Sequence, residues 1–105
     1  MMRAVSCCVA VLVSGVLIAR AGSSHTYKPS AGYVPDEVTA IKIAVAVWEP
    51  IYGAAAIAKE KPYHATLHGR IWTVTGSLPR GATGGVALAE MSKEDGRITH
   101  ISHGR

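Results

Sequence analysis

The segment that constrains the fold most is residues 37–48, because almost all of its side chains are apolar. Asp36 precedes it as a good N-cap, and Pro50 is expected to end or kink a helix there. A surface helix normally shows a wide polar face, whereas this pattern predicts a helix covered on most sides, as a curved sheet would do. The polar or small positions recur at spacings of three or four and would form one narrow stripe: Thr39, Lys42, Ala46 and Glu49.

From residue 61 onward the apolar side chains recur with a period of two, which indicates strands. Four strands are predicted, over residues 63–68, 71–78, 86–92 and 97–103, with a turn and a short second helix before them over residues 51–59. The last two strands are joined by a predicted turn with Gly96 in the left-handed region. Helices first and strands afterwards are typical of an α+β domain with an antiparallel meander.

The first 21 residues have the pattern of a secretory signal peptide, namely Arg3, an apolar run, and small residues up to Ala21. The run is about 15 residues long, and a bilayer-spanning helix needs about 20, so cleavage after Ala21 is favoured over a permanent anchor. Residues 22–32 are polar and small and predict a flexible leader, and residues 33–105 would form the domain. We therefore expect a periplasmic or secreted protein that meets a membrane only through the signal peptide before cleavage.

Removal of residues 1–21 changes the chemistry of what remains. Cys7 and Cys8 leave together with two arginines, so nine basic residues face seven acidic ones and the net charge falls from +4 to +2. Disulfides usually stabilise small exported domains, so this one is expected to hold by packing alone. The remaining charge is too small and too scattered to predict nucleic-acid binding.

No pattern predicts catalysis, a cofactor or a bound metal. His64 and His68 share a strand face but lie about 13 Å apart by the strand rise. His100 and His103 are three residues apart on a strand, so they point to opposite faces. Neither pair can close a metal site, and a domain without cysteine is a poor host for structural zinc.

Glu90 is the one carboxylate inside a predicted strand. It alternates in phase with Val86 and Leu88, so it could face inward and transfer protons in a cavity. The alternative is a place at the rim of the sheet, paired with Arg97 or Lys93.

Several blocks of the chain resemble bacterial immunity proteins with a nuclear transport factor 2-like fold. The first block is the most specific, and the later pieces follow in the expected order, so the resemblance covers residues 33–105. Those pieces are Tyr33-Val34-Pro35-Asp36, Thr39-Ala40-Ile41-Lys42-Ile43-Ala44 and Trp48-Glu49-Pro50-Ile51-Tyr52-Gly53, and later Trp72, Val74, Gly76, Leu78-Pro79, Gly84-Gly85-Val86, Asp95-Gly96 and His103-Gly104.

The resemblance implies a shortened cone-like α+β fold, in which the N-terminal helix is wrapped by a curved antiparallel sheet of about four strands. It also implies binding and neutralisation of a cognate toxin in polymorphic-toxin competition, without catalytic residues. The signal peptide departs from a cytoplasmic antidote and suggests neutralisation in the periplasm. From the predicted geometry, the candidate partner contacts are the basic side chains near the strand turns: His64, His68, Arg70 and Arg80.

A second interpretation stays open at this point. The same cone fold could bind a small ligand or be a vestigial isomerase-like domain in the periplasm, with Tyr52 and Glu90 near the mouth of a cavity. A large pocket lined by Glu90 would favour this interpretation, whereas a filled cone with a polar outer sheet would favour toxin binding. The sequence sets neither the toxin nor the oligomeric state.

Overall fold

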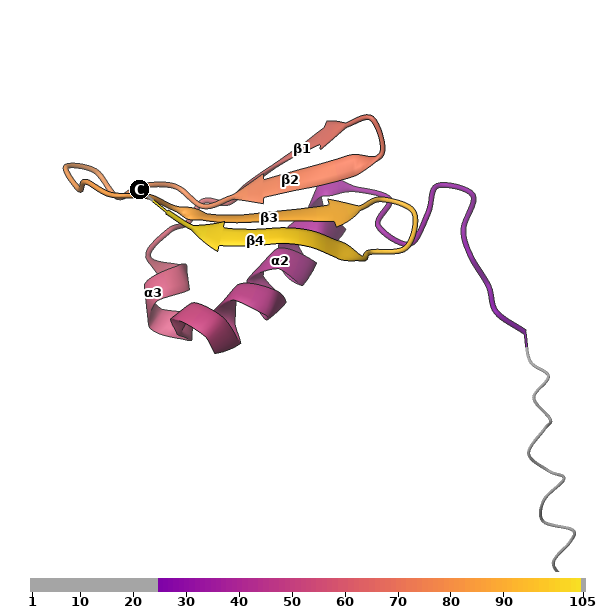
Figure 1. Ribbon diagram of the computed structural model, residues 1–105, viewed down its shortest axis with the longest axis horizontal. Helices are drawn as coiled ribbons and strands as arrows, with labels where there is room; N and C mark the ends of the chain where they lie inside the picture. The colour runs from indigo at the N-terminus through magenta and orange to yellow at the C-terminus, as the bar shows by residue number, and fades with distance from the viewer. Residues whose placement is uncertain (1–24, 105) are drawn as a thin grey trace, which may run out of the picture.

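The computed structural model describes residues 25–104, and the predicted signal peptide lies outside them. The four strands form one sheet in the order β1-β2-β3-β4, each antiparallel to the next, with two helices before them in the chain (Figure 1). The predicted α+β class and antiparallel meander are confirmed. The elements are α2 (Glu37–Tyr52), α3 (Ala54–Ala58), β1 (His64–His68), β2 (Ile71–Thr75), β3 (Ala87–Ser92) and β4 (Ile98–His103).

Helix α2 begins as the sequence predicts. The Asp36 carboxylate accepts a hydrogen bond from the Thr39 N–H at 2.8 Å, which satisfies one of the free donors of the first turn. The same hydrogen bonding lowers the pKa of Asp36 below its ordinary value, because it favours the ionised form.

The far end of α2 differs from the prediction, because the helix continues through Pro50 to Tyr52. Pro50 lies in the last turn, where its missing N–H removes a single helical hydrogen bond. The helix ends instead at Gly53, which has φ +96° and donates its N–H to the Glu49 carbonyl at 2.8 Å. A positive φ costs glycine little, so Gly53 is the stronger stop signal.

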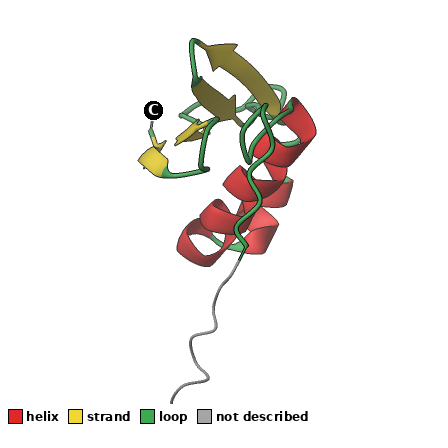
Figure 2. Ribbon diagram, turned by 90° about the vertical axis from the view of Figure 1, so that its right-hand side faces the viewer, coloured by secondary structure: helices red, strands yellow, loops and turns green. Residues whose placement is uncertain are grey.

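One face of α2 packs on the sheet. Ala40, Ala44 and Trp48, four residues apart, are fully buried. Val38 and Ile51 are 62% and 56% exposed, so the prediction of a helix covered on most sides is wrong in extent. Both helices lie on one side of the strands (Figure 2). Four other apolar side chains of α2 are half-buried, namely Ile41, Ile43, Val45 and Val47.

Small side chains on the sheet allow α2 to approach closely. Ala87 and Ala89 of β3 are fully buried in the same cluster as Trp48, so the large indole has room between helix and sheet. The Trp48 Nε1–H donates to the Leu88 carbonyl at 3.3 Å, and its ring lies 5.9 Å from that of Tyr63. The interior is therefore filled by the indole instead of forming a cavity beneath it.

The end of the predicted leader, residues 22–32, is held against the β3–β4 turn. The Val34 N–H donates to the Lys93 carbonyl at 3.1 Å, and the Val34 carbonyl accepts from the indole N–H of Trp72 at 2.8 Å. Gly32 has φ +90°, and a Cβ there would lie 2.4 Å from the Lys93 carbonyl oxygen. The Lys93 ammonium also donates to the Ala31 carbonyl, so the last residues of the predicted leader contact the sheet.

Replacing Trp48 should test how far the fold depends on this contact. Trp48→Ala is expected to lower the free energy of unfolding by about 3–5 kcal/mol, because it removes a buried aromatic side chain and leaves a cavity. Val38→Ala on the exposed side of the same helix should change it by less than about 0.5 kcal/mol. Urea unfolding followed by circular dichroism measures both, and equal losses would contradict the packing described.

Candidate functional site

The side chains of the sheet that point away from α2 form a face that neither helix covers (Figure 2). We call it the outer face. Most of these side chains are polar, as expected where an antiparallel sheet has one face on the core and the other toward water. The register places them in three rows across the sheet: His64, Thr75, Leu88 and Ser102; Thr66, Thr73, Glu90 and His100; and His68, Ile71 and Ser92.

Two of the predicted contacts, His64 and His68, lie on this outer face. Both are exposed and belong to β1, with Thr66 between them. The structure adds a third exposed histidine, His100 of β4, in the row of Thr66. The outer face thus offers three imidazoles, which can donate or accept hydrogen bonds at neutral pH.

The other two predicted contacts lie at opposite ends of the sheet. Arg70 is in the β1–β2 turn, and Arg80 is in the loop between β2 and β3, which extends from the other end (Figure 1). Arg70 is engaged in an ion pair with Glu94, whereas Arg80 is exposed. The four predicted residues therefore do not form one cluster.

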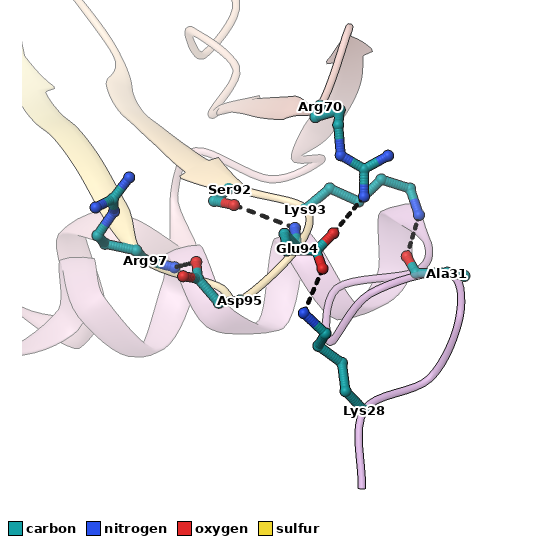
Figure 3. A network of polar contacts seen from close by, with 8 residues as sticks. All are labelled: Lys28, Ala31, Arg70, Ser92, Lys93, Glu94, Asp95 and Arg97. Atoms are coloured by element: carbon teal, nitrogen blue, oxygen red, sulfur yellow. Dashed lines mark hydrogen bonds and ion pairs between the residues drawn. The ribbon is translucent and has the colours of Figure 1, made fainter.

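Glu94 is the centre of a polar network at the β3–β4 turn (Figure 3). Its carboxylate accepts hydrogen bonds from Lys28 of the N-terminal segment and from Arg70 of the neighbouring turn. Both hydrogen bonds favour the ionised carboxylate and lower the pKa of Glu94 below its ordinary value, and the bond from Lys28 has the larger effect. Next to it, the Lys93 ammonium donates to the Ala31 carbonyl, so the network ties three segments together.

The β3–β4 turn has the predicted form. Gly96 has φ +77° and donates its N–H to the Ser92 carbonyl at 2.8 Å. The Asp95 carboxylate accepts from the Arg97 N–H at 3.0 Å, and this hydrogen bond lowers the pKa of Asp95.

Glu90 does not face the interior, which was one of the two positions considered for it, and no ion pair joins it to Arg97 or Lys93 among the described residues. The buried positions of β3 are Ala87, Ala89 and Met91, so Glu90 is on the outer face, half-buried between Thr73 and His100. The reason is steric. The small side chains of Ala87 and Ala89 leave space for the indole of Trp48, whereas Leu88 and Glu90 in their place would be too large. The sequence does carry a signal for this choice, because Ala87, Ala89 and Met91 are all apolar whereas Glu90 and Ser92 of the other phase are polar.

A buried carboxylate does exist, but it is Glu60, which is 7% exposed. Its Oε1 accepts from the Ala87 N–H at 2.8 Å, and its Oε2 lies 2.7 Å from Nε2 of His103. The Glu60 carbonyl accepts from the Ser77 N–H at 2.7 Å, and the His103 ring lies 5.0 Å from that of Tyr52. Glu60 thereby holds together the ends of α3, β3 and β4.

Nothing local in the sequence identifies Glu60. It stands between Lys59 and Lys61, a pattern typical of a solvated turn. Gly76 is the residue that makes room for this carboxylate, because a Cβ there would lie 2.3 Å from Oε1 of Glu60. The sequence does not show that the two residues are neighbours.

A pocket of about 370 Å³ lies beside His103, and neither Tyr52 nor Glu90 lines it. His103 is the one titratable residue in its lining, so the cavity predicted for Glu90 is not found there. The lining residues are Thr83, Gly84, Gly85, His103 and Gly104.

Among residues 25–104, no three histidine, cysteine, aspartate or glutamate side chains gather closely enough to hold a metal ion. In the same part of the chain, no helix is long and apolar enough to cross a membrane.

Comparison with known proteins places the chain in a family. The family described as NTF2 fold immunity protein matches residues 39–105. The chain belongs to this family. The match covers α2 except its first two residues, α3 and the whole sheet, so the nuclear transport factor 2-like interpretation of the fold is confirmed, and an immunity-type, non-catalytic role is supported.

The chain is also 34% identical over 73 residues to the uncharacterized protein YhhH of Escherichia coli strain K12. That match covers 69% of this chain and 58% of YhhH, so the chain spans somewhat more than half the length of this relative. No solved structure matches the chain.

Substitution of Gly76 should reveal the Glu60 contact. Gly76→Ala is expected to lower the free energy of unfolding by about 1–3 kcal/mol, because the new methyl would overlap a carboxylate already held by Ala87 and His103. Gly104→Ala is the control, since a Cβ there meets nothing within 4 Å. Urea unfolding measures both, and an unchanged Gly76→Ala protein would contradict the contact.

The Glu94 network should make stability depend on pH in the acid range. Because the folded-state pKa of Glu94 lies below its ordinary value of 4.5, its contribution is present above about that pH and is lost as pH falls through the folded pKa. Glu94→Gln should therefore be less stable than wild type at pH 7, with the difference shrinking below pH 4.5. Urea unfolding at several pH values measures this, and a constant difference would contradict it.

Proposed function

We propose that this chain is an exported binding protein of the immunity type that neutralises a cognate bacterial toxin by direct binding, with the outer face as its docking surface. Family membership supports the immunity role. The choice of surface is supported by the packing, because Trp48 and the buried alanines fill the space between helix and sheet. Within residues 25–104 nothing covers the polar outer face, and this is the one observation that carries the assignment.

The chemistry of the outer face suits recognition of a protein. Its serine, threonine and histidine side chains have few rotatable bonds, so less conformational entropy is lost when a partner orders them. They are held on a hydrogen-bonded sheet, and this reduces the cost further. His64 and His68 would contact the toxin directly.

The two arginines would act at the rim of the interface. Arg70 and Arg80 stand beyond opposite ends of the strands, where charges guide approach more than they add affinity. The ion pair with Glu94 fixes the position of Arg70. An acidic patch on the toxin near either end would complete the match.

The site of action would be the periplasm or the cell exterior. The pattern of residues 1–21 supports export, and the first described contact of the N-terminal segment is made by Lys28. Cleavage after Ala21 would therefore leave every contact described above intact.

Charge reversal on β1 tests the docking surface. The His64→Glu, His68→Glu double variant should bind the C-terminal domain of a toxin encoded beside its gene at least about tenfold more weakly, because two new carboxylates would face the partner. Lys42→Glu, on the exposed stripe of α2, is the matched control and should bind normally. Isothermal titration calorimetry measures both. If the double variant and wild type bound the toxin equally well, the outer face would not be the interface. If wild type did not bind the toxin, the immunity proposal would be wrong.

The export step has a separate test. Mass spectrometry of the periplasmic fraction should find a chain that starts near Gly22. An intact chain confined to the cytoplasm would contradict export while leaving toxin binding open to test.

A further inference from the structure

Strand β1 lies at the edge of the sheet, and two of its residues have backbone N–H and C=O groups without a partner among residues 25–104. Gly76 donates its N–H to Ala87 and the Arg70 carbonyl accepts from Lys93, so the even residues of β2 direct their backbone groups toward β3. The odd residues of β2 must then bond β1, at the positions paired with His64, Thr66 and His68.

It follows that Ala65 and Leu67 direct their N–H and C=O groups away from β2, toward the open side of β1. In the part of the chain that the structure describes, no backbone hydrogen bond reaches either residue from that side. Figure 1 shows β1 as the outermost strand there.

Edge strands are usually protected against pairing by lysine, proline or a bulge, and β1 has none of these. The other edge strand, β4, differs, because its pairing with β3 shifts register between Glu90 and Met91. A bulge of this kind twists an edge away from regular pairing. The two edges are therefore not equivalent, and β1 is the one suited to add a strand.

The sequence of β1 also suits pairing with itself. His64-Ala65-Thr66-Leu67-His68 has the same alternation of polar and apolar residues in both directions about Thr66. A two-fold interface requires such self-complementarity, since residue i meets residue j and j meets i.

We propose that β1 pairs antiparallel with β1 of a second copy of this chain, with the two-fold axis at Thr66. Ala65 of each copy would exchange both backbone hydrogen bonds with Leu67 of the other, and the two Thr66 side chains would meet directly. Leu67, which is 39% exposed, would be partly covered by Ala65 of the second copy, which would stand opposite it.

The pairing would join two four-stranded sheets edge to edge. His64 of one copy would stand opposite His68 of the other, so the outer face would continue from one copy to the next and remain open to a toxin. A five-residue contact is small for a protein interface, so the dimer would be weak and dependent on concentration. The inference does not depend on the proposed function.

Sedimentation of the purified full chain from about 10 µM to about 1 mM should show a shift from monomer to dimer. Thr66→Lys and Thr66→Glu should each remain monomeric, since like charges would meet at the axis, and an equal mixture of the two should dimerise again. His100→Lys adds the same charge to the outer face far from this edge and should dimerise as wild type does.

Hydrogen exchange measured by NMR supplies a test without substitutions. The Ala65 and Leu67 amides should exchange more slowly as concentration rises, whereas the Thr66 amide, bonded to β2, should be protected throughout. A wild type that stays monomeric, or a dimer that keeps its affinity in Thr66→Lys, would overturn the proposal. So would Ala65 and Leu67 amides whose exchange does not depend on concentration, or amides protected only when a toxin is added.

Discussion

The structure depends on the close approach of α2 to the sheet. Trp48 fits between the two layers because alanines stand both on the helix, at Ala40 and Ala44, and on the facing strand β3. Large side chains at these positions would hold the layers apart and leave the indole without close contacts. Since packing fills the interior, a role that depends on the surface follows more readily than one that depends on an internal cavity.

The same contact determines where the polar chemistry of the chain lies. Once the alanines of β3 face the helix, Glu90 must lie on the outer face, together with His64, His68 and His100. The carboxylate that is buried, Glu60, is used to hold the ends of the helical segment and two strands together through Ala87 and His103. The outer face therefore carries most of the polar side chains that the strands offer to a partner, in keeping with the immunity family to which the chain belongs.

The segment that follows the expected cleavage site is part of the fold. Val34 accepts from the indole of Trp72, and Lys28 and Arg70 meet at Glu94, so the segment closes the end of the sheet next to the β3–β4 turn. All of these contacts begin after the expected cleavage site. An exported chain could therefore lose its signal peptide and still fold without a disulfide, by packing and a few well-placed hydrogen bonds.

Local patterns were enough to predict the α+β class, the strand order, the Asp36 cap and the turn at Gly96, because these depend on residues close together in the chain. They were also enough to place His64 and His68 on one face, since side chains alternate along a strand. Only the tertiary structure decided the burial of Glu60 and the pairing of Arg70 with Glu94. Each of these depends on which distant segment lies opposite, and the register of the sheet sets that, not any local signal.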